Sequence, residues 1–338
     1  MITGHEMDAA QSADNKIWRI TVAVLTYRRP EGIIKLLDSL ISQERHPARP
    51  YHMTVLVVDN DATESSRSLV EGFDTKGAFD LVYAVEPRQG IPVARNHALD
   101  KAPQPAPDTG ELLDPDYFCF LDDDEWATEG WMDAMLDTCI RSQADCVYGY
   151  VVPVYPENPP EYWVKARVFE STRNQEGGRI DYAASNNVMF DYKLVRSWNL
   201  RFEEKMLNTG GTDYLFFNQA VKLGMKIVWT ERAMVYDIIP LKRMTWKWVL
   251  QRQYRLGNTF AVSEVLHGNR KQRLYRLMYG ITRTGLGVAM LPTLAVSPYL
   301  GMRALTHLLR GAGVVTGLFG HFYQEYQPVK EMPSPASK

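Results

Sequence analysis

The sequence predicts an α/β protein with a mostly parallel β-sheet and helices on both of its faces. Two patterns in the first 125 residues indicate this fold class: continuous β-branched apolar runs alternate with helix-forming segments, and polar clusters follow three of the runs. The length of 338 residues agrees, because it suits one large α/β domain or two ordinary ones. Parallel sheets of this kind bind ligands beyond the carboxyl ends of their strands.

Four strands and three helices are predicted in alternation. The apolar runs are continuous, as in buried parallel strands, and the first helical segment has an apolar stripe on one side. Pro92 stands near the first turn of the third helix, where its missing N–H costs little. The strands are expected at Ile20–Leu25, Met53–Val58, Phe79–Val85 and Tyr117–Leu121, and the helices at Glu31–Ser42, shortly after DNDATESS, and from about Gln89 to Lys101.

The second half of the chain is less regular. A loop rich in proline is expected at Pro103–Gly110, and a longer, mobile loop at Tyr155–Gly178. The other expected elements are a strand at Asp145–Val154, a helix at Asp213–Leu223, and two short strands at Met225–Trp229 and Ala233–Tyr236.

Composition and charge narrow the class of protein. Apolar residues make up 45% of the chain and charged residues 23%, which excludes a disordered, collagen-like or coiled-coil protein. The overall net charge of −2 gives no sign of a nucleic-acid partner. However, residues 1–240 carry 24 basic and 37 acidic residues, whereas residues 241–338 carry 14 basic and 3 acidic ones. We therefore expect the C-terminal region to face an anionic partner.

The cysteines and the first residues indicate the compartment. The three cysteines, Cys119, Cys139 and Cys146, have no metal-ligand spacing and suit a reducing environment. Residues 1–16 are polar and lack the apolar segment of a secretory signal, so we expect a disordered tail there.

The strongest local motif is the acidic run Asp122-Asp123-Asp124-Glu125 at the end of the fourth strand. Four successive carboxylates repel one another unless a cation neutralises them, and Asp-x-Asp spacing lets alternate side chains share a divalent ion with a diphosphate-bearing ligand. A solvated acidic turn that caps the helix beginning near Thr128 explains the run equally well. Both interpretations stay open for this motif alone.

Two further segments each allow a functional and a structural interpretation. In Gln89–Asn96, the turn at Gly90, the free N–H groups of a helix start and Arg95 can hold an anion, or they form an ordinary capped helix with a surface ion pair. In Thr209–Asp213, a glycine-rich turn delivers Asp213 to a helix start, either as a general base or as an N-cap.

Taken together, the motifs resemble the inverting family 2 glycosyltransferases with the GT-A fold. The resemblance covers about residues 18–260 and is greatest to bacterial enzymes that build exopolysaccharide repeat units. The matching stretches occur in the family's order: VAVLTYRRP, VVDND, GIPVARNHAL, FLDDDE and GGTDYLFF.

The resemblance implies a role for each matching residue. Thr26 and Tyr27, with Arg28 beside them, would line the nucleotide-base pocket, and Asp59 would hydrogen-bond the uracil ring. Asp213 falls on the family's catalytic base. The remaining implied positions are nucleotide contacts at Arg95, Asp122 and Asp123, and a direct ligand to Mn²⁺ or Mg²⁺ at Asp124.

The sequence departs from the family pattern at three points. The usual Glu-Asp pair is Thr212-Asp213, and the downstream His that sometimes completes the metal site is absent, leaving Asp237 as the nearest replacement. The Gln-x-x-Arg-Trp motif of processive synthases is also missing, which favours addition of a single sugar. Arg252 and Arg255, together with Thr212, are instead candidate contacts to the diphosphate or the acceptor.

The C-terminal region combines basic, aromatic and apolar residues. Between residues 241 and 310 there are twelve Lys or Arg and one acidic residue, and no clean apolar run of about 20 residues. This pattern is typical of interfacial elements on an anionic membrane, although a helical subdomain or a dimer interface explains it as well. We expect a GT-A catalytic domain at 17–240 and a helical, membrane-associated region at 241–338.

The sequence thus predicts a metal-dependent enzyme that is peripheral to the cytoplasmic face of the inner membrane. It would transfer one sugar, from a UDP-hexose, to a lipid-linked saccharide in polysaccharide assembly. The alternatives are a sugar-phosphate nucleotidyltransferase, disfavoured because Thr26–Pro30 is too short for its loop, and a non-catalytic nucleotide-sugar-binding or scaffold protein. A nucleic-acid partner is not expected, and homo-oligomerisation is left open.

Overall fold

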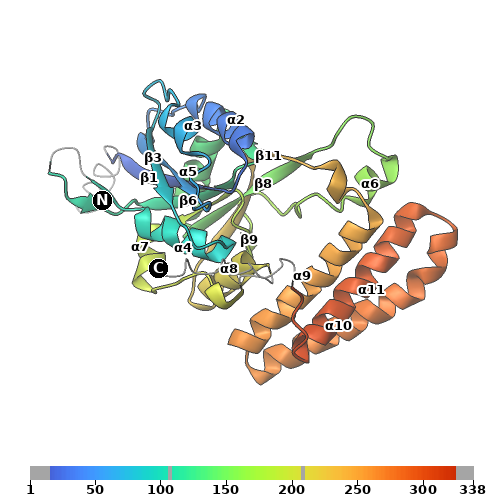
Figure 1. Ribbon diagram of the computed structural model, residues 1–338. Helices are drawn as coiled ribbons and strands as arrows, with labels where there is room; N and C mark the ends of the chain where they lie inside the picture. The colour runs from blue at the N-terminus through green and yellow to red at the C-terminus, as the bar shows by residue number, and fades with distance from the viewer. Residues whose placement is uncertain (1–15, 106–108, 207–209, 325–338) are drawn as a thin grey trace, which may run out of the picture.

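A computed structural model describes residues 16–105, 109–206 and 210–324 (Figure 1). Residues 1–15, where a disordered tail was expected, lie outside the described residues. In Figure 1 a twisted sheet with its covering helices makes up one part of the molecule, and three long helices, α9, α10 and α11, pack side by side next to it.

The amino-terminal half of the sheet is parallel, as predicted. Its strand order is β3-β2-β1-β6. The register places Thr26 opposite Asp59, and Leu25 opposite Asp122, so three of the predicted polar clusters lie at the same edge of the sheet. The strands are β1 Trp18–Thr26, β2 Tyr51–Asp59, β3 Asp80–Val85 and β6 Tyr117–Asp122.

Helices cover both faces of this sheet. On one face, α2, α3 and α5 bury apolar side chains against alternate residues of β1 such as Val22 and Val24. On the other face, α4 and α8 pack against the intervening residue Ala23 and its neighbours. The alternation follows from the two-residue period of a strand. The helices are α2 Pro30–Ile41, α3 Arg67–Glu71, α4 Ile91–Lys101, α5 Trp131–Ser142, α7 Tyr192–Ser197 and α8 Thr212–Lys222.

The carboxy-terminal half of the sheet is mixed and differs from the sequence prediction in detail. β10, Val188–Asp191, was not predicted and lies antiparallel between β6 and β8. The segments expected as two short strands form one strand, β11, whose pairing with β8 is irregular between Thr230 and Val235. β7 forms within and after the acidic run and pairs with β11. The bounds are β7 Glu125–Ala127, β8 Cys146–Val154, β9 Arg179–Ile180 and β11 Ile227–Ile238.

The two predicted loops contain regular structure. Gln104–Pro105 (β4) and Leu112–Leu113 (β5) pair as a short antiparallel ribbon. The segment 155–178 contains helix α6, Glu161–Ala166, and its Trp163 is fully buried. The buried indole ties this segment to the C-terminal helices, because Trp163 packs in one cluster with Val249 and Met302.

The predicted helical C-terminal region is confirmed. It consists of η2 Leu241–Arg243, α9 Trp246–His267, α10 Arg270–Met290, η3 Leu291–Ala295 and α11 Pro298–Leu318. Glycines allow the helices to approach closely: a Cβ at Gly257 would come within 1.9 Å of the Arg310 carbonyl oxygen, and one at Gly313 within 2.0 Å of the Tyr254 carbonyl oxygen. Within the described chain, no helix has the length and apolar character needed to cross a membrane.

Candidate active site

The carboxyl ends of β1, β2 and β6 bring the predicted site residues together. Thr26 ends β1 and donates its hydroxyl hydrogen to Asp123 Oδ2 at 2.9 Å. At the end of β2, Asn60 donates its backbone N–H to the Thr26 carbonyl oxygen and accepts the backbone N–H of Gly90 at 2.7 Å. The loop after β1, the acidic run and the start of α4 are therefore connected by direct hydrogen bonds.

Asp59 is completely buried beneath this edge. Its carboxylate accepts the backbone N–H groups of Asp61 and Ser66 and the Tyr83 hydroxyl at 2.8 Å. Burial and the hydrogen bond to Asp59 raise the pKa of Tyr83. In this structure Asp59 organises the loop after β2, and its contact with a uracil ring stays a prediction.

Tyr27 and Arg28 lie on the exposed side of the loop after β1. The Arg28 guanidinium lies over the Tyr27 ring and donates to both carboxylate oxygens of Asp61, at 2.8 and 3.4 Å. Arg28 has a φ of 54°, a conformation that is unusual for a residue with a Cβ. Its ion pair with the nearly buried Asp61 holds the loop in this conformation.

The acidic run packs against the start of α2. A Cβ at Gly32 would come within 2.2 Å of the Asp123 carbonyl oxygen. Arg29, just before α2, donates from one guanidinium nitrogen to Asp123 Oδ1 at 3.3 Å and to Asp124 Oδ2 at 3.1 Å. The Arg29 side chain therefore neutralises part of the acidic run, while half of its surface remains exposed.

Carboxylates accumulate at the end of β6. Part of the Asp122 residue is exposed, but the surrounding protein removes water from its carboxyl group, and this desolvation raises the pKa of Asp122 to about 7. The charge of Arg95 opposes the shift, and the charges of Asp124, Asp123 and Asp237 add to it. Pairing of β7 with β11 sets Asp237 opposite Glu125. Burial and the negative charge of Asp124 raise the pKa of Asp237 to about 6. Such mutual repulsion is what a bound cation relieves.

The carboxylate oxygens of Asp124 and Asp237 suit a divalent ion. Oδ1 of Asp237 is buried without a hydrogen-bond partner, and Asp124 is close enough to perturb it. Carboxylate oxygens are the ligands that Mg²⁺ and Mn²⁺ prefer. Within the described ranges, no three His, Cys, Asp or Glu side chains come together closely enough to form a complete ion site.

Arg95 connects α4 to the start of α8. Its guanidinium donates to Thr212 Oγ1 at 3.0 Å and lies over the Phe202 ring, and it is more than nine-tenths buried. Its charge also acts on Asp122. The interpretation of Arg95 as the member of an ordinary surface ion pair is therefore not supported, since its guanidinium donates to a buried hydroxyl.

Asp213 is not the N-cap of α8. Gly211 occupies that position with a φ of 74°, and a Cβ there would come within 2.3 Å of the Thr259 side chain on α9. Asp213 stands in the first turn, where its Oδ1 accepts the backbone N–H of Tyr214 at 2.8 Å. The hydrogen bond from Arg95 to Thr212 places the next residue, Asp213, beside α4 at this edge of the sheet. Burial, with the charges of Asp213, Glu125 and Asp122, raises the pKa of Tyr148.

Arg252 and Arg255 come from α9, and the negative charge of Asp237 acts on Arg252. Arg252 donates to the Val168 carbonyl oxygen at 3.2 Å and lies over the Trp248 ring. Burial, together with the positive charges of Arg255, Arg243 and Arg310, lowers the pKa of Arg252 to about 10. A positively charged region therefore adjoins the carboxylates, as an anionic ligand lying between them would require.

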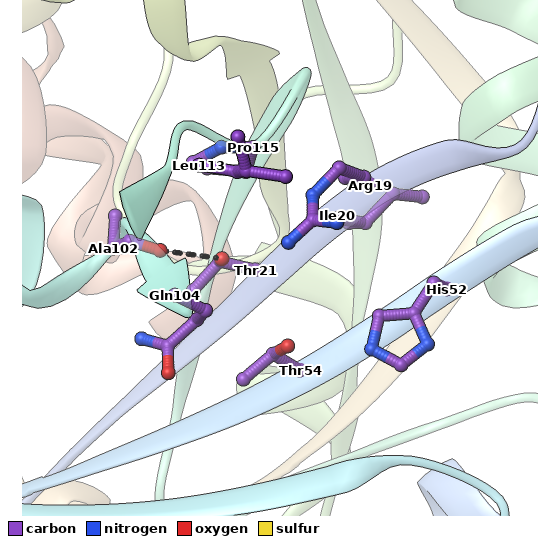
Figure 2. A pocket seen from close by; sticks show the side chains of 9 residues that line it. All are labelled: Arg19, Ile20, Thr21, His52, Thr54, Ala102, Gln104, Leu113 and Pro115. Carbon is purple, nitrogen blue, oxygen red and sulfur yellow. Dashed lines mark hydrogen bonds between the residues drawn. The ribbon is translucent and has the colours of Figure 1, made fainter. Parts of the chain in front are cut away.

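The crevice in Figure 2 is a different feature. It is lined by the amino-terminal halves of β1 and β2, including Thr21 and Thr54, and Thr21 donates to the Ala102 carbonyl oxygen there. Its volume of about 10 Å³ has room for a single water molecule. A nucleotide does not fit in this crevice.

Comparison with known sequences gives two matches that decide the family. Residues 21–198, more than half of the chain, match Glycosyl transferase family 2. The succinoglycan biosynthesis protein ExoM of Rhizobium meliloti is 30% identical over 327 residues, which is 95% of this chain and 99% of ExoM. The chain belongs to glycosyl transferase family 2.

Solved structures confirm the fold of this family 2 glycosyltransferase. The mannosyltransferase PcManGT from Pyrobaculum calidifontis, in complex with GDP-Man and Mn²⁺, has a TM-score of 0.53 at 18% identity, covering 92% of this chain and 94% of its own. S. aureus TarS 1–349 in complex with UDP-GlcNAc has a TM-score of 0.51 at 14% identity, covering 87% and 91%. The predicted GT-A fold is therefore correct.

Several residues of the glycosyltransferase site were missed by sequence reasoning. They are Arg29, Gly32, Asp61 and Glu86. Glu86, almost fully buried after β3, accepts from the Arg88 backbone and guanidinium. The stretches RRP and DND contain Arg29 and Asp61, but which carboxylate pairs with which arginine depends on the register of β1, β2 and β6.

Proposed function

We propose that this family 2 glycosyltransferase moves a single sugar, with inversion, from a UDP-hexose to a lipid-linked saccharide in exopolysaccharide assembly. The observation that carries the proposal is the convergence of Thr26, the acidic run, Arg95 and Asp213 on one edge of the sheet. The name of ExoM supports the role in polysaccharide assembly, and the ligand named for TarS supports a UDP-sugar.

The donor would lie across the carboxyl ends of the strands. Contacts to the base are proposed for Thr26, Tyr27 and Asp59. Contacts to the rest of the nucleotide are proposed for Arg28, Arg95, Asp122 and Asp123. Mn²⁺ or Mg²⁺ would be held by Asp124; when bound, the ion supplies charge that stabilises the departing diphosphate. Support for the ion comes from the unpartnered Asp237 oxygen and from the Mn²⁺ named for PcManGT.

Asp213 is proposed as the base. Its carboxylate would take the proton of the acceptor hydroxyl while that oxygen bonds to the anomeric carbon. The bond from that carbon to the diphosphate breaks on the opposite face, and the diphosphate leaves with the electron pair. The hydrogen bond from the Tyr214 N–H to Oδ1 fixes the carboxylate's orientation. Thr212, Arg252 and Arg255 are proposed contacts to the diphosphate or the acceptor.

We also propose that the enzyme works at the cytoplasmic face of the inner membrane, held there by residues 241–338. The basic composition of that region supports this location, and a lipid-linked acceptor requires it.

Mass spectrometry of products formed with UDP- and GDP-sugars, a lipid-linked acceptor and Mn²⁺ tests the proposal. A hexose added from a UDP-sugar is expected, and Asp213→Asn should lower turnover by about 10²–10⁴-fold with little change in UDP affinity. Donor binding without any turnover in the unmodified protein would instead favour a non-catalytic nucleotide-sugar-binding protein. A loss of less than tenfold in Asp213→Asn would contradict the role of Asp213.

A further inference from the structure

Helix α10 exposes an unusually large apolar surface. Of the 21 large apolar side chains exposed among the described residues, eight lie between residues 274 and 296. We call these eight the outer face of α10: Leu274, Tyr275, Met278, Ile281, Leu286, Val288, Leu294 and Val296. At 3.6 residues per turn, the six that belong to the helix fall within an arc of about 160°.

The part of α10 that meets α11 carries small residues. A Cβ at Gly287 would come within 2.4 Å of the Leu308 backbone nitrogen, and one at Gly280 within 2.9 Å of the Val314 side chain. A Cβ at Gly311 of α11 would come within 2.4 Å of Thr284 Oγ1. Helix α10 therefore packs on α11 through its smallest side chains and turns its large apolar side chains away from the protein. Helices whose outer side faces lipid show this arrangement.

The charge on α10 and α11 has one sign. Together the two helices carry seven Lys or Arg and no acidic residue. Arg270 and Lys271 are exposed, fall at the amino-terminal end of the same arc, and form no ion pair within the part of the chain described here. An apolar surface with cationic residues at its end is complementary to a bilayer that contains anionic lipids.

We propose that the outer face of α10 is the surface by which this enzyme docks on an anionic membrane. The proposal rests on the proposed function, because it assigns one surface to the membrane association suggested there. A second copy of the chain fits this surface less well than a membrane does. A symmetric pairing through α10 would bring two helices that carry basic and no acidic residues against each other, and their like charges would repel.

Point substitutions test the docking surface better than a truncation. Met302 of α11 is fully buried with Trp163 and Val249, so deleting α10 and α11 would remove part of a core cluster. Ile281→Glu places a charge in the middle of the outer face. Leu223→Glu, at the end of α8, is the matched control, because both side chains are 51% exposed.

The measurement is co-sedimentation with vesicles of one part phosphatidylglycerol to three parts phosphatidylcholine. The full chain and Leu223→Glu should bind, whereas Ile281→Glu should bind at least tenfold more weakly. Replacing Arg270 and Lys271 by Gln should weaken binding about fivefold for each charge. Pure phosphatidylcholine should bind the full chain less than the mixed vesicles.

Equal sedimentation of Ile281→Glu and the full chain would overturn the proposal. So would a dimer in light scattering that Ile281→Glu dissociates, because the outer face would then be an interface between copies. Calorimetric binding of UDP with Mn²⁺, without vesicles, is measured in the same samples. Unchanged UDP binding in Ile281→Glu shows that the fold is intact, and failure of UDP binding in the full chain would contradict the proposed function alone.

Discussion

Gly32 gives a sharp prediction about how the acidic run is positioned. Its Cβ position lies 2.2 Å from the Asp123 carbonyl oxygen and 3.6 Å from the Asp124 Cα. Ordinary contacts of a Cβ begin at 3.4 Å, so Gly32→Ala must push α2 and the acidic run apart by about 1 Å. The contact is between two backbones, and no side chain can rotate away to relieve it.

We expect two effects of Gly32→Ala. Overpacking of this kind destabilises a protein by about 1–3 kcal/mol, which guanidinium denaturation measures. A displacement of about 1 Å in a site residue lowers turnover on the order of 10²-fold. The assay is the rate of sugar transfer from a UDP-sugar, measured at saturating Mn²⁺.

Gly285→Ala is the matched control. Nothing lies within 4 Å of its Cβ position, and alanine in a helix interior is favoured over glycine by about 0.5–1 kcal/mol. This variant should keep full turnover in a detergent-solubilised assay and unfold at slightly higher denaturant. If Gly32→Ala matched the unmodified protein in both stability and turnover, the direct support of the acidic run by α2 would be refuted.

Three further substitutions probe the same edge of the sheet. Asp124→Ala should abolish Mn²⁺-dependent UDP binding in calorimetry without lowering the melting temperature, because it removes a repulsive charge; unchanged affinity would contradict the metal assignment. Arg29→Gln should raise the affinity for Mn²⁺ alone about two- to fivefold, since the ion no longer displaces a guanidinium from Asp123 and Asp124; unchanged or weaker binding, with Arg67→Gln as control, would contradict this. Thr212→Val deprives a buried Arg95 of its hydroxyl partner and should cost about 1–3 kcal/mol in urea denaturation; a neutral effect would show that this hydrogen bond is dispensable.

The sequence was sufficient for the parts of the fold that local patterns encode. Ile20–Leu25 is a continuous apolar run, and Gly90 with Pro92 specifies a helix start, so β1 and α4 could be located closely. The four-residue strand β10 could not, because only its pairing with β6 and β8 makes it a strand. The same holds for β7, which forms within an acidic run through its register with β11.

In the candidate site, too, residue types could be predicted from local motifs, whereas contacts between distant segments could not. The motifs identified Asp122, Asp124 and Asp213 by residue type and order. They did not reveal that Arg29 bridges two carboxylates, because this contact joins segments about 95 residues apart. Asp237 was named only as a replacement for the absent His, and strand register is what sets it opposite Glu125. The cap position of α8 belongs to Gly211, which excludes the N-cap interpretation of Asp213, while its role as a general base stays a proposal.

Proton NMR of the product tests the central claim most directly. A lipid-linked saccharide is incubated with Mn²⁺ and an α-linked UDP-hexose, and the configuration of the new linkage is read from the coupling of its anomeric proton. Displacement assisted by Asp213 predicts a β-linked product that the Asp213→Asn variant forms at a rate lower by about 10²–10⁴-fold. An α-linked product, or a β-linked product formed equally fast by that variant, would contradict the account.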